Sequence, residues 1–182
     1  MKKRALAGLA ILFAANLAWA GGFRIALKGS YFSSEDSVFR DVYGSAAKLG
    51  LEAGLEIAPN LLLWADADTM HKTGKLTVSQ EDTKVWITPI GVGLRYEIPA
   101  GDKFLFHVKA GLEDVFFKEE NVIGTASESA LGFIAAAGGA YRVADAVSLG
   151  LFASWSTCKM SHNGMDFKSG GIDLGGAIEI RF

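Results

Sequence analysis

The last segment of the chain alternates strictly between apolar and polar positions. From Gly170 to Phe182, one set of alternate positions holds Ile172, Leu174, Gly176, Ile178, Ile180 and Phe182. The positions between them hold Asp173, Gly175, Ala177, Glu179 and Arg181. Successive side chains of an extended strand point to opposite faces, so the pattern predicts a strand with one oily face and one charged face.

The same two-residue period returns upstream and predicts seven further strands. They lie near residues 23–31, 48–57, 61–68, 86–98, 104–113, 131–142 and 147–155. In the third, placing Leu63 and Ala65 outward puts Trp64, Asp66 and Asp68 inside. The opposite phase would expose two aspartates to lipid at a cost of a few kcal/mol each, so we favour the first. The alanine- and glycine-rich sixth strand, Leu131 to Arg142, leaves its phase open.

The connections between these strands alternate between short and long. The short ones are Pro59-Asn60, Pro99 to Asp102 and Val143 to Asp145. The long, polar ones are Phe32–Ala47, Met70–Thr83, Asp114–Ala130 and Ser156–Gly170. Strict alternation is typical of hairpins with turns at one end and loops at the other. The sequence therefore predicts an all-β fold, an eight-stranded antiparallel up-and-down transmembrane β-barrel with both termini on the short-turn side.

The N-terminus indicates export. Lys2, Lys3 and Arg4 precede an apolar stretch that is too short to span a bilayer, and Ala18-Trp19-Ala20 is a small-x-small cleavage site. We expect a signal peptide at residues 1–20 and one barrel domain at residues 21–182. Removing the signal changes the net charge from −2 to −5 and leaves nothing that favours nucleic-acid binding. Cys158 is the only cysteine and cannot form an internal disulfide.

With this signal peptide, this strand rhythm and the terminal Ile178-Glu179-Ile180-Arg181-Phe182, the chain resembles the small eight-stranded OmpA/OmpX-type, porin-like barrels of the Gram-negative cell envelope. The resemblance implies location in the cell outer membrane and contact with its lipid, its lipopolysaccharide and its assembly machinery, as a monomer. It also implies that the terminal strand carries the assembly signal, at Gly176, Ile178, Ile180 and Phe182. Such barrels serve several functions, so the fold alone does not choose one.

Charged residues of both signs recur at the inward positions. The set comprises Arg24, Lys28, Glu52, Glu56, Asp66, Asp68, Arg95, Glu97, Lys109, Glu113, Asp173, Glu179 and Arg181, with Lys48 and Arg142 beside them. An eight-stranded barrel is only wide enough for its own side chains, so we expect these charges to pair as an interior plug. The alternative is a polar path for protons or solutes.

One tripeptide raises the question of catalysis. The outer-membrane lipid A deacylases are eight-stranded barrels whose histidine and serine lie two residues apart on one strand face. Here Ser161 and His162 are adjacent, so on a strand they would point to opposite faces, although a turn at Asn163-Gly164 could bring them together. Interior His107 is most simply a hydrogen-bonded side chain. We expect no catalytic residue, cofactor or metal.

The loops are the other candidate surface. Glu35, Asp36 and Asp41 could bridge divalent cations to lipopolysaccharide or could simply be solvated. The sequence favours a small closed, non-enzymatic barrel that acts through its extracellular loops or as an envelope component. The alternatives are a conduit for small or hydrophobic molecules and a lipid A-modifying, deacylase-like enzyme. Any extracellular partner is unknown.

Overall fold

The computed structural model describes residues 22–75, 81–122, 124–162 and 165–182, with the backbone alone described at residues 162, 165 and 166. The predicted signal peptide, residues 1–20, lies outside the described residues. The elements in chain order are β1 (Phe23–Ser34), α2 (Ser37–Tyr43), β2 (Ala46–Ala58), β3 (Leu61–Lys75), β4 (Asp82–Ala100), β5 (Phe104–Asn121), β6 (Gly124–Ala144), β7 (Val147–His162), β8 (Met165–Lys168) and β9 (Gly171–Arg181). No helix in the described ranges is long and apolar enough to cross a membrane.

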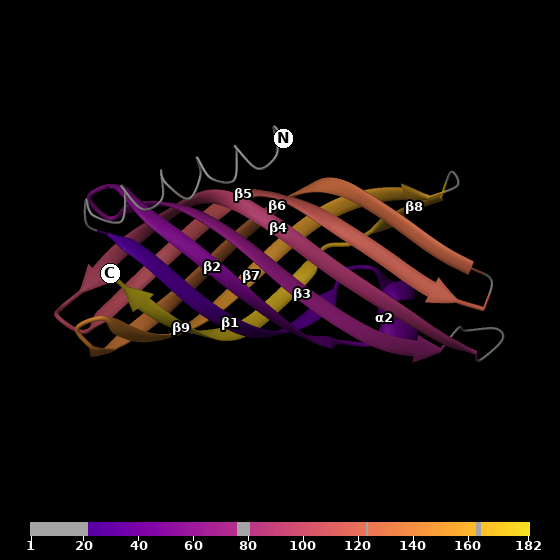
Figure 1. Cartoon of the computed structure of the whole chain (residues 1–182), viewed down its shortest axis with the longest axis horizontal. Helices are drawn as coiled ribbons and strands as arrows, with labels where there is room; N and C mark the ends of the chain where they lie inside the picture. Colours follow the sequence, from indigo (N-terminus) through magenta and orange to yellow (C-terminus); the bar gives the residue numbers. More distant parts are fainter. Residues whose placement is uncertain (1–21, 76–80, 123, 163–164) are drawn as a thin grey trace, which may run out of the picture.

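Eight of the strands close into a barrel (Figure 1). Each of β1 to β6 pairs antiparallel with the next, β6 pairs with β7, β7 with β9, and β9 with β1. The short β8 forms a hairpin with the end of β7. The predicted eight-stranded up-and-down barrel is confirmed.

The faces of the strands follow the predicted alternation. Leu51, Leu94 and Leu149 point out of the barrel and are 57, 48 and 48% exposed. Trp64 is fully buried in the lumen, so the phase chosen for the third strand is correct. The sixth strand, whose phase the sequence left open, turns Leu131 outward. A closed barrel with an apolar outer surface leaves no unpaired backbone in the hydrocarbon layer.

The two ends of the barrel differ, as predicted. The start of β1 and the end of β9 lie at the same end as the short turns: Phe182 N donates to Phe23 O at 2.9 Å, and their rings lie 5.9 Å apart. Asn60 takes the positive φ of 63° that the tight β2–β3 turn needs. In outer-membrane barrels the short turns face the periplasm, so this end is the periplasmic one.

The long connections differ from the prediction. They are largely strand: β5 continues to Asn121 and β6 begins at Gly124, which leaves little of the expected Asp114–Ala130 loop. β4 has 19 residues and β6 has 21, whereas a tilted strand needs only about 10 to cross the bilayer. The barrel wall therefore continues beyond the membrane as an extracellular extension, which comprises residues 32–47, 70–75, 81–87, 115–122, 124–131, 156–162 and 165–170.

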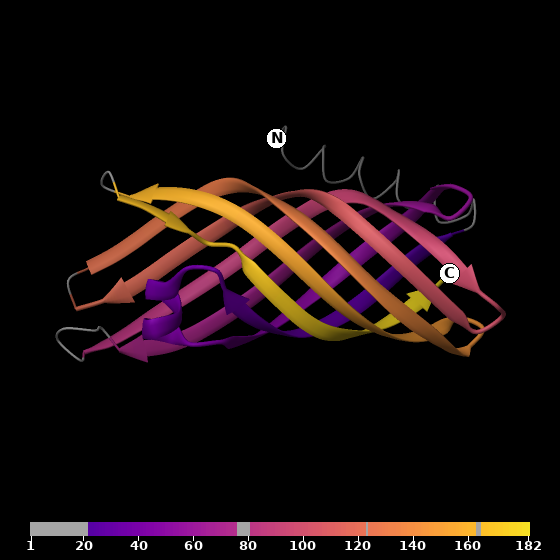
Figure 2. The same ribbon diagram turned by 180° about the vertical axis from the view of Figure 1, so that it is seen from behind.

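An apolar core fills this extension. Its buried members are Phe32, Tyr43, Ala46, Met70, Val85, Ile87, Val115, Phe117, Cys158 and Met160. Helix α2 covers this core at the end opposite the C-terminus (Figure 2). Asp36 caps the helix by accepting from Phe39 N at 3.0 Å. Tyr43 anchors its other end through a 2.9 Å hydrogen bond to Thr83, and burial raises the pKa of the phenol above its usual value.

Candidate functional site

The lumen at membrane level contains a network of buried charges, and its periplasmic tier is built on arginine. Arg24 of β1 binds Glu97 and lies 3.3 Å from Glu179. Arg95 of β4 lies 2.9 Å from Glu97 and 2.8 Å from Glu179. Both guanidinium groups thus share both carboxylates, and all four side chains are less than 10% exposed. Planar guanidinium groups suit such shared pairing.

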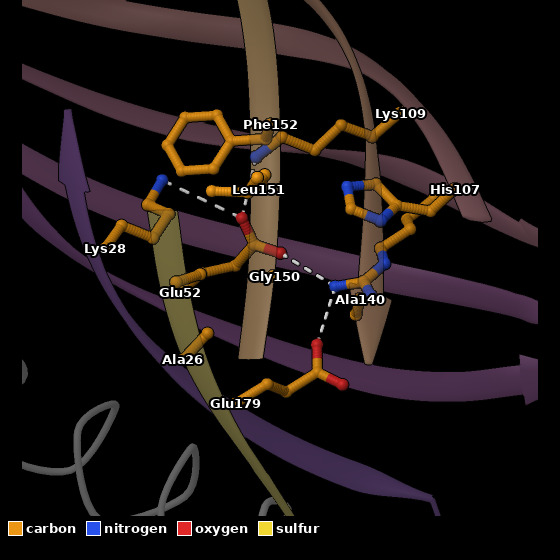
Figure 3. A pocket seen from close by; sticks show the side chains of 12 residues that line it. Ala26, Lys28, Glu52, His107, Lys109, Ala140, Gly150, Leu151, Phe152 and Glu179 are labelled. Carbon is orange, nitrogen blue, oxygen red and sulfur yellow. Dashed lines mark hydrogen bonds and ion pairs between the residues drawn. The ribbon is translucent and has the colours of Figure 1, made fainter. Parts of the chain in front are cut away.

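The middle tier is built on lysine. Lys109 Nζ lies 2.7 Å from Glu52 and 3.3 Å from Asp66, and it sits 4.2 Å from the centre of the Trp64 ring. Lys28 Nζ reaches Asp66 at 2.6 Å and Asp68 at 3.0 Å. Figure 3 shows Glu52 between the Lys28 and Lys109 side chains, which come from different strands. The tier therefore ties β1, β2, β3 and β5 together across the lumen.

Lys48 and Asp173 form the tier nearest the apolar core. Their charged atoms lie 2.7 Å apart, and Lys48 is also 3.8 Å from Asp68. Asp173 accepts further hydrogen bonds from Ser30 at 3.1 Å and from Ser154 at 3.3 Å. A buried carboxylate with one cation and two hydroxyl partners has its hydrogen-bonding capacity well satisfied. The polar network therefore ends at this tier on its extracellular side.

Small residues on the opposite wall make room for these long side chains. Ala140, Gly150 and Ala177 line a cavity of about 40 Å³ beside His107 (Figure 3). A Cβ added at Gly138 would lie 2.7 Å from the His107 ring, so that position needs glycine. The Nδ1 atom of His107 has no hydrogen-bond partner among the described residues, and the cavity has room for a few waters that could supply one.

Three of the residues predicted for the network lie apart from these pairs. Glu56 is 35% exposed and lies 4.0 Å from Arg24 at the periplasmic mouth. Arg181 is half-buried at the same mouth, and no ion pair joins it to another described residue. Glu113 is 5% exposed and likewise has no ion pair in the described part of the chain. The sequence did not predict that Ser30 and Ser154 bind Asp173. The alternation shows that these serines face inward, but nothing in the sequence indicates which carboxylate they contact.

The residues considered for catalysis and metal binding are not gathered into one site. Ser161 and His162 are consecutive on β7, while the His162 side chain and Asn163 lie outside the described residues. Asp36 caps α2, and Glu35 accepts a hydrogen bond from the Trp155 indole. Within the described ranges, no group of three His, Cys, Asp or Glu side chains could hold a metal ion. Two of the three acidic residues thus serve the local fold.

The fold and the lumen together define a small closed barrel of the outer-membrane type. The chain belongs to the outer membrane protein beta-barrel domain family, whose model matches residues 5–177. Membership of this family places the protein in the outer membrane.

Solved structures of small outer-membrane barrels are similar in fold. Neisserial surface protein A (NspA) is 14% identical, with a TM-score of 0.71 over 88% of this chain and 97% of that chain. The N-terminal barrel domain of Pseudomonas aeruginosa OprF is 13% identical, with a TM-score of 0.61 over 89% and 98%. Yersinia pestis Ail, in complex with the heparin analogue sucrose octasulfate, is 13% identical, with a TM-score of 0.51 over 89% and 97%. None of the curated proteins matches the chain in sequence. At these identities the likeness shows the fold alone.

Proposed function

We propose that this protein is a closed, non-conducting and non-enzymatic barrel whose extracellular extension is a contact surface on the cell envelope. The observation that carries the proposal is that the barrel interior is closed by two successive layers of different chemistry. Ion pairs fill it at membrane level, and the apolar core under α2 fills it above. A hydrated solute would have to disrupt buried salt bridges and then cross an apolar layer.

The extension supports the second half of the proposal. Its outward face mixes polar and apolar side chains: Lys84, Lys118, Lys159 and Ser161 are exposed on β4, β5 and β7, and so are Val38 of α2 and Phe116 of β5. The apolar core beneath holds this surface in place without help from the membrane. Acidic and basic residues occur in similar numbers over the extension, so its charge does not favour the sulfated ligand that was crystallised with Ail. The proposal therefore leaves the chemistry of the partner open.

Planar-bilayer recording tests closure. The purified protein should give no discrete conductance steps. A variant with residues 35–44 replaced by a short glycine-serine linker loses α2 but keeps the ion-pair network, so it should remain closed to ions. Wild-type conductance steps would support the conduit alternative instead.

Trimming the extension tests the contact role. Replacing Lys118–Ser127 by Asn-Gly, which favours a tight hairpin turn, shortens the β5–β6 hairpin above the membrane. The variant should still assemble but should lose the cell-surface phenotype of the wild type, such as adhesion or aggregation. As a control, the same Asn-Gly dipeptide inserted between Gly101 and Asp102, in a periplasmic turn, should not affect that phenotype. Loss of an acyl chain from lipid A in cells expressing the wild type, seen by mass spectrometry, would instead support the enzyme alternative.

A further inference from the structure

A cavity at the periplasmic mouth has an unusual lining. It measures about 140 Å³. Its basic lining residues are Arg24, Lys103, Arg142 and Arg181, and its acidic ones are Glu56 and Glu97. The mouth therefore carries more basic than acidic side chains, in contrast to the lumen above it, where carboxylates outnumber cations.

Most of the basic groups are not neutralised by the protein. Glu97 is occupied by Arg24 and Arg95 in the arginine tier. No ion pair within the described residues involves Lys103, Arg142 or Arg181. Glu56 is the remaining carboxylate, and its oxygen lies 4.0 Å from the Arg24 guanidinium group. The Lys103 ammonium lies 5.9 Å from the centre of the Tyr141 ring, so exposed Arg142 and half-buried Arg181 are the two cations left beside this carboxylate.

Two further features at this mouth are energetically costly. Arg24 and Arg181 are directly opposite each other on β1 and β9, and like charges in that position destabilise a sheet. Arg24 is 3% exposed, and its Nε has no hydrogen-bond partner among the described residues. A buried donor without a partner is also unfavourable. An anion with several acceptor atoms in the cavity would offset the repulsion between the two guanidinium groups.

We propose that the periplasmic mouth binds a phosphate group, with Arg142 and Arg181 as its charge partners and the Ser148 hydroxyl as a further donor. Inorganic phosphate and the phosphodiester of a lipid headgroup are both anions with at least two acceptor oxygens, and guanidinium groups bind such oxygens in pairs. A cavity of this volume holds a few waters or one such group with water around it.

The phosphate has two possible sources. It is either a free ion of the periplasm or the headgroup of a phospholipid in the inner leaflet, which meets the barrel at the height of the periplasmic girdle. The proposal is independent of the contact role of the extension, because the two sites are at opposite ends of the barrel.

Amide chemical shifts of the folded barrel test the proposal. In a zwitterionic detergent, inorganic phosphate should shift the Ser148 and Arg142 amides saturably, beyond the effect of sodium chloride at matched ionic strength. Arg142→Gln should weaken this response at least tenfold. The control Lys75→Gln removes the same charge from an exposed side chain at the extracellular end and should leave the response unchanged. A second arm, in phosphate-free buffer, adds short-chain phosphatidylglycerol to the barrel in the same zwitterionic detergent, which is chosen to contain no phosphorus.

The two arms separate the sources. Saturable shifts with inorganic phosphate alone identify a free ion, and shifts with phosphatidylglycerol in phosphate-free buffer identify a lipid headgroup. The proposal is overturned if neither arm shifts Ser148, if sodium chloride reproduces the shifts, or if Arg142→Gln responds as the wild type does.

Discussion

Replacing Lys109 by methionine should strongly destabilise the barrel. The side chain is 9% exposed, and its Nζ is the closest cation to Glu52 at 2.7 Å and a second cation for Asp66 at 3.3 Å. Methionine keeps an unbranched stem beside Trp64 and removes the charge, so cavity formation contributes little. Removing one partner from a buried ion pair costs about 3–5 kcal/mol, and we expect a loss of that size.

Glu113→Gln is the control, because it removes a negative charge from a lumen that already holds an excess of carboxylates. Buried carboxylates outnumber cations in the described lumen, and Glu113 has no ion pair there, so Glu113→Gln reduces the excess negative charge at nearly constant shape. It should change stability by less than about 1 kcal/mol or stabilise the barrel. The measurement is reversible urea unfolding in lipid vesicles. The folded fraction is read from the gel mobility of unheated samples. Tryptophan fluorescence is avoided as the readout, because Lys109 contacts Trp64 and its replacement would change the signal directly. A loss below about 1 kcal/mol for Lys109→Met would show that water screens the lumen as it does a surface pair.

Three smaller perturbations test other parts of the structure. Leu94→Arg places a charge in lipid and should cost about 2–4 kcal/mol in the same unfolding assay; an unchanged free energy would contradict the outward assignment. Deleting Phe182 should lower the amount of barrel in outer-membrane fractions, while Ser127→Ala on the exposed face of β6 should not; equal amounts would make the terminal aromatic incidental to assembly. Asp36→Ala removes the cap of α2 and should cost about 0.5–2 kcal/mol locally, which hydrogen exchange of the Phe39 amide would detect as faster exchange, without loss of assembly.

The membrane part of the fold could be predicted because lipid allows few alternatives. A strand that crosses the bilayer must expose apolar side chains at every second position, so the phase of Leu94 against Arg95 follows directly from the sequence. Only the alanine- and glycine-rich β6 gave no contrast between its faces. The order of strands followed from the connection lengths.

The extension was predicted as loops because the polarity of the two strand faces is exchanged above the membrane: the outward face becomes more polar and the inward face apolar. In β5, Leu112 points into lipid and Lys109 into the lumen, whereas further along the same strand Lys118 is outside and Phe117 is buried inside. The strand does not change phase; its surroundings change from lipid to water. A search for strands with oily outer faces therefore ends where the membrane ends, although the backbone pairing continues.

The pairing of charges was beyond the sequence for a related reason. Alternation determines which face of the strand a side chain is on but not its position along the barrel axis. That position, its height, depends on how far each tilted strand is staggered against its neighbours. Arg24 consequently binds Glu97, 73 residues away, while Glu56, which was predicted only to face inward, lies at the mouth. Charges that balance closely over the whole lumen are thus separated by height into an acidic middle and a basic mouth. The local imbalance at Arg142 and Arg181 arises from this stagger, which is why a binding site there becomes visible only once the strands are in register.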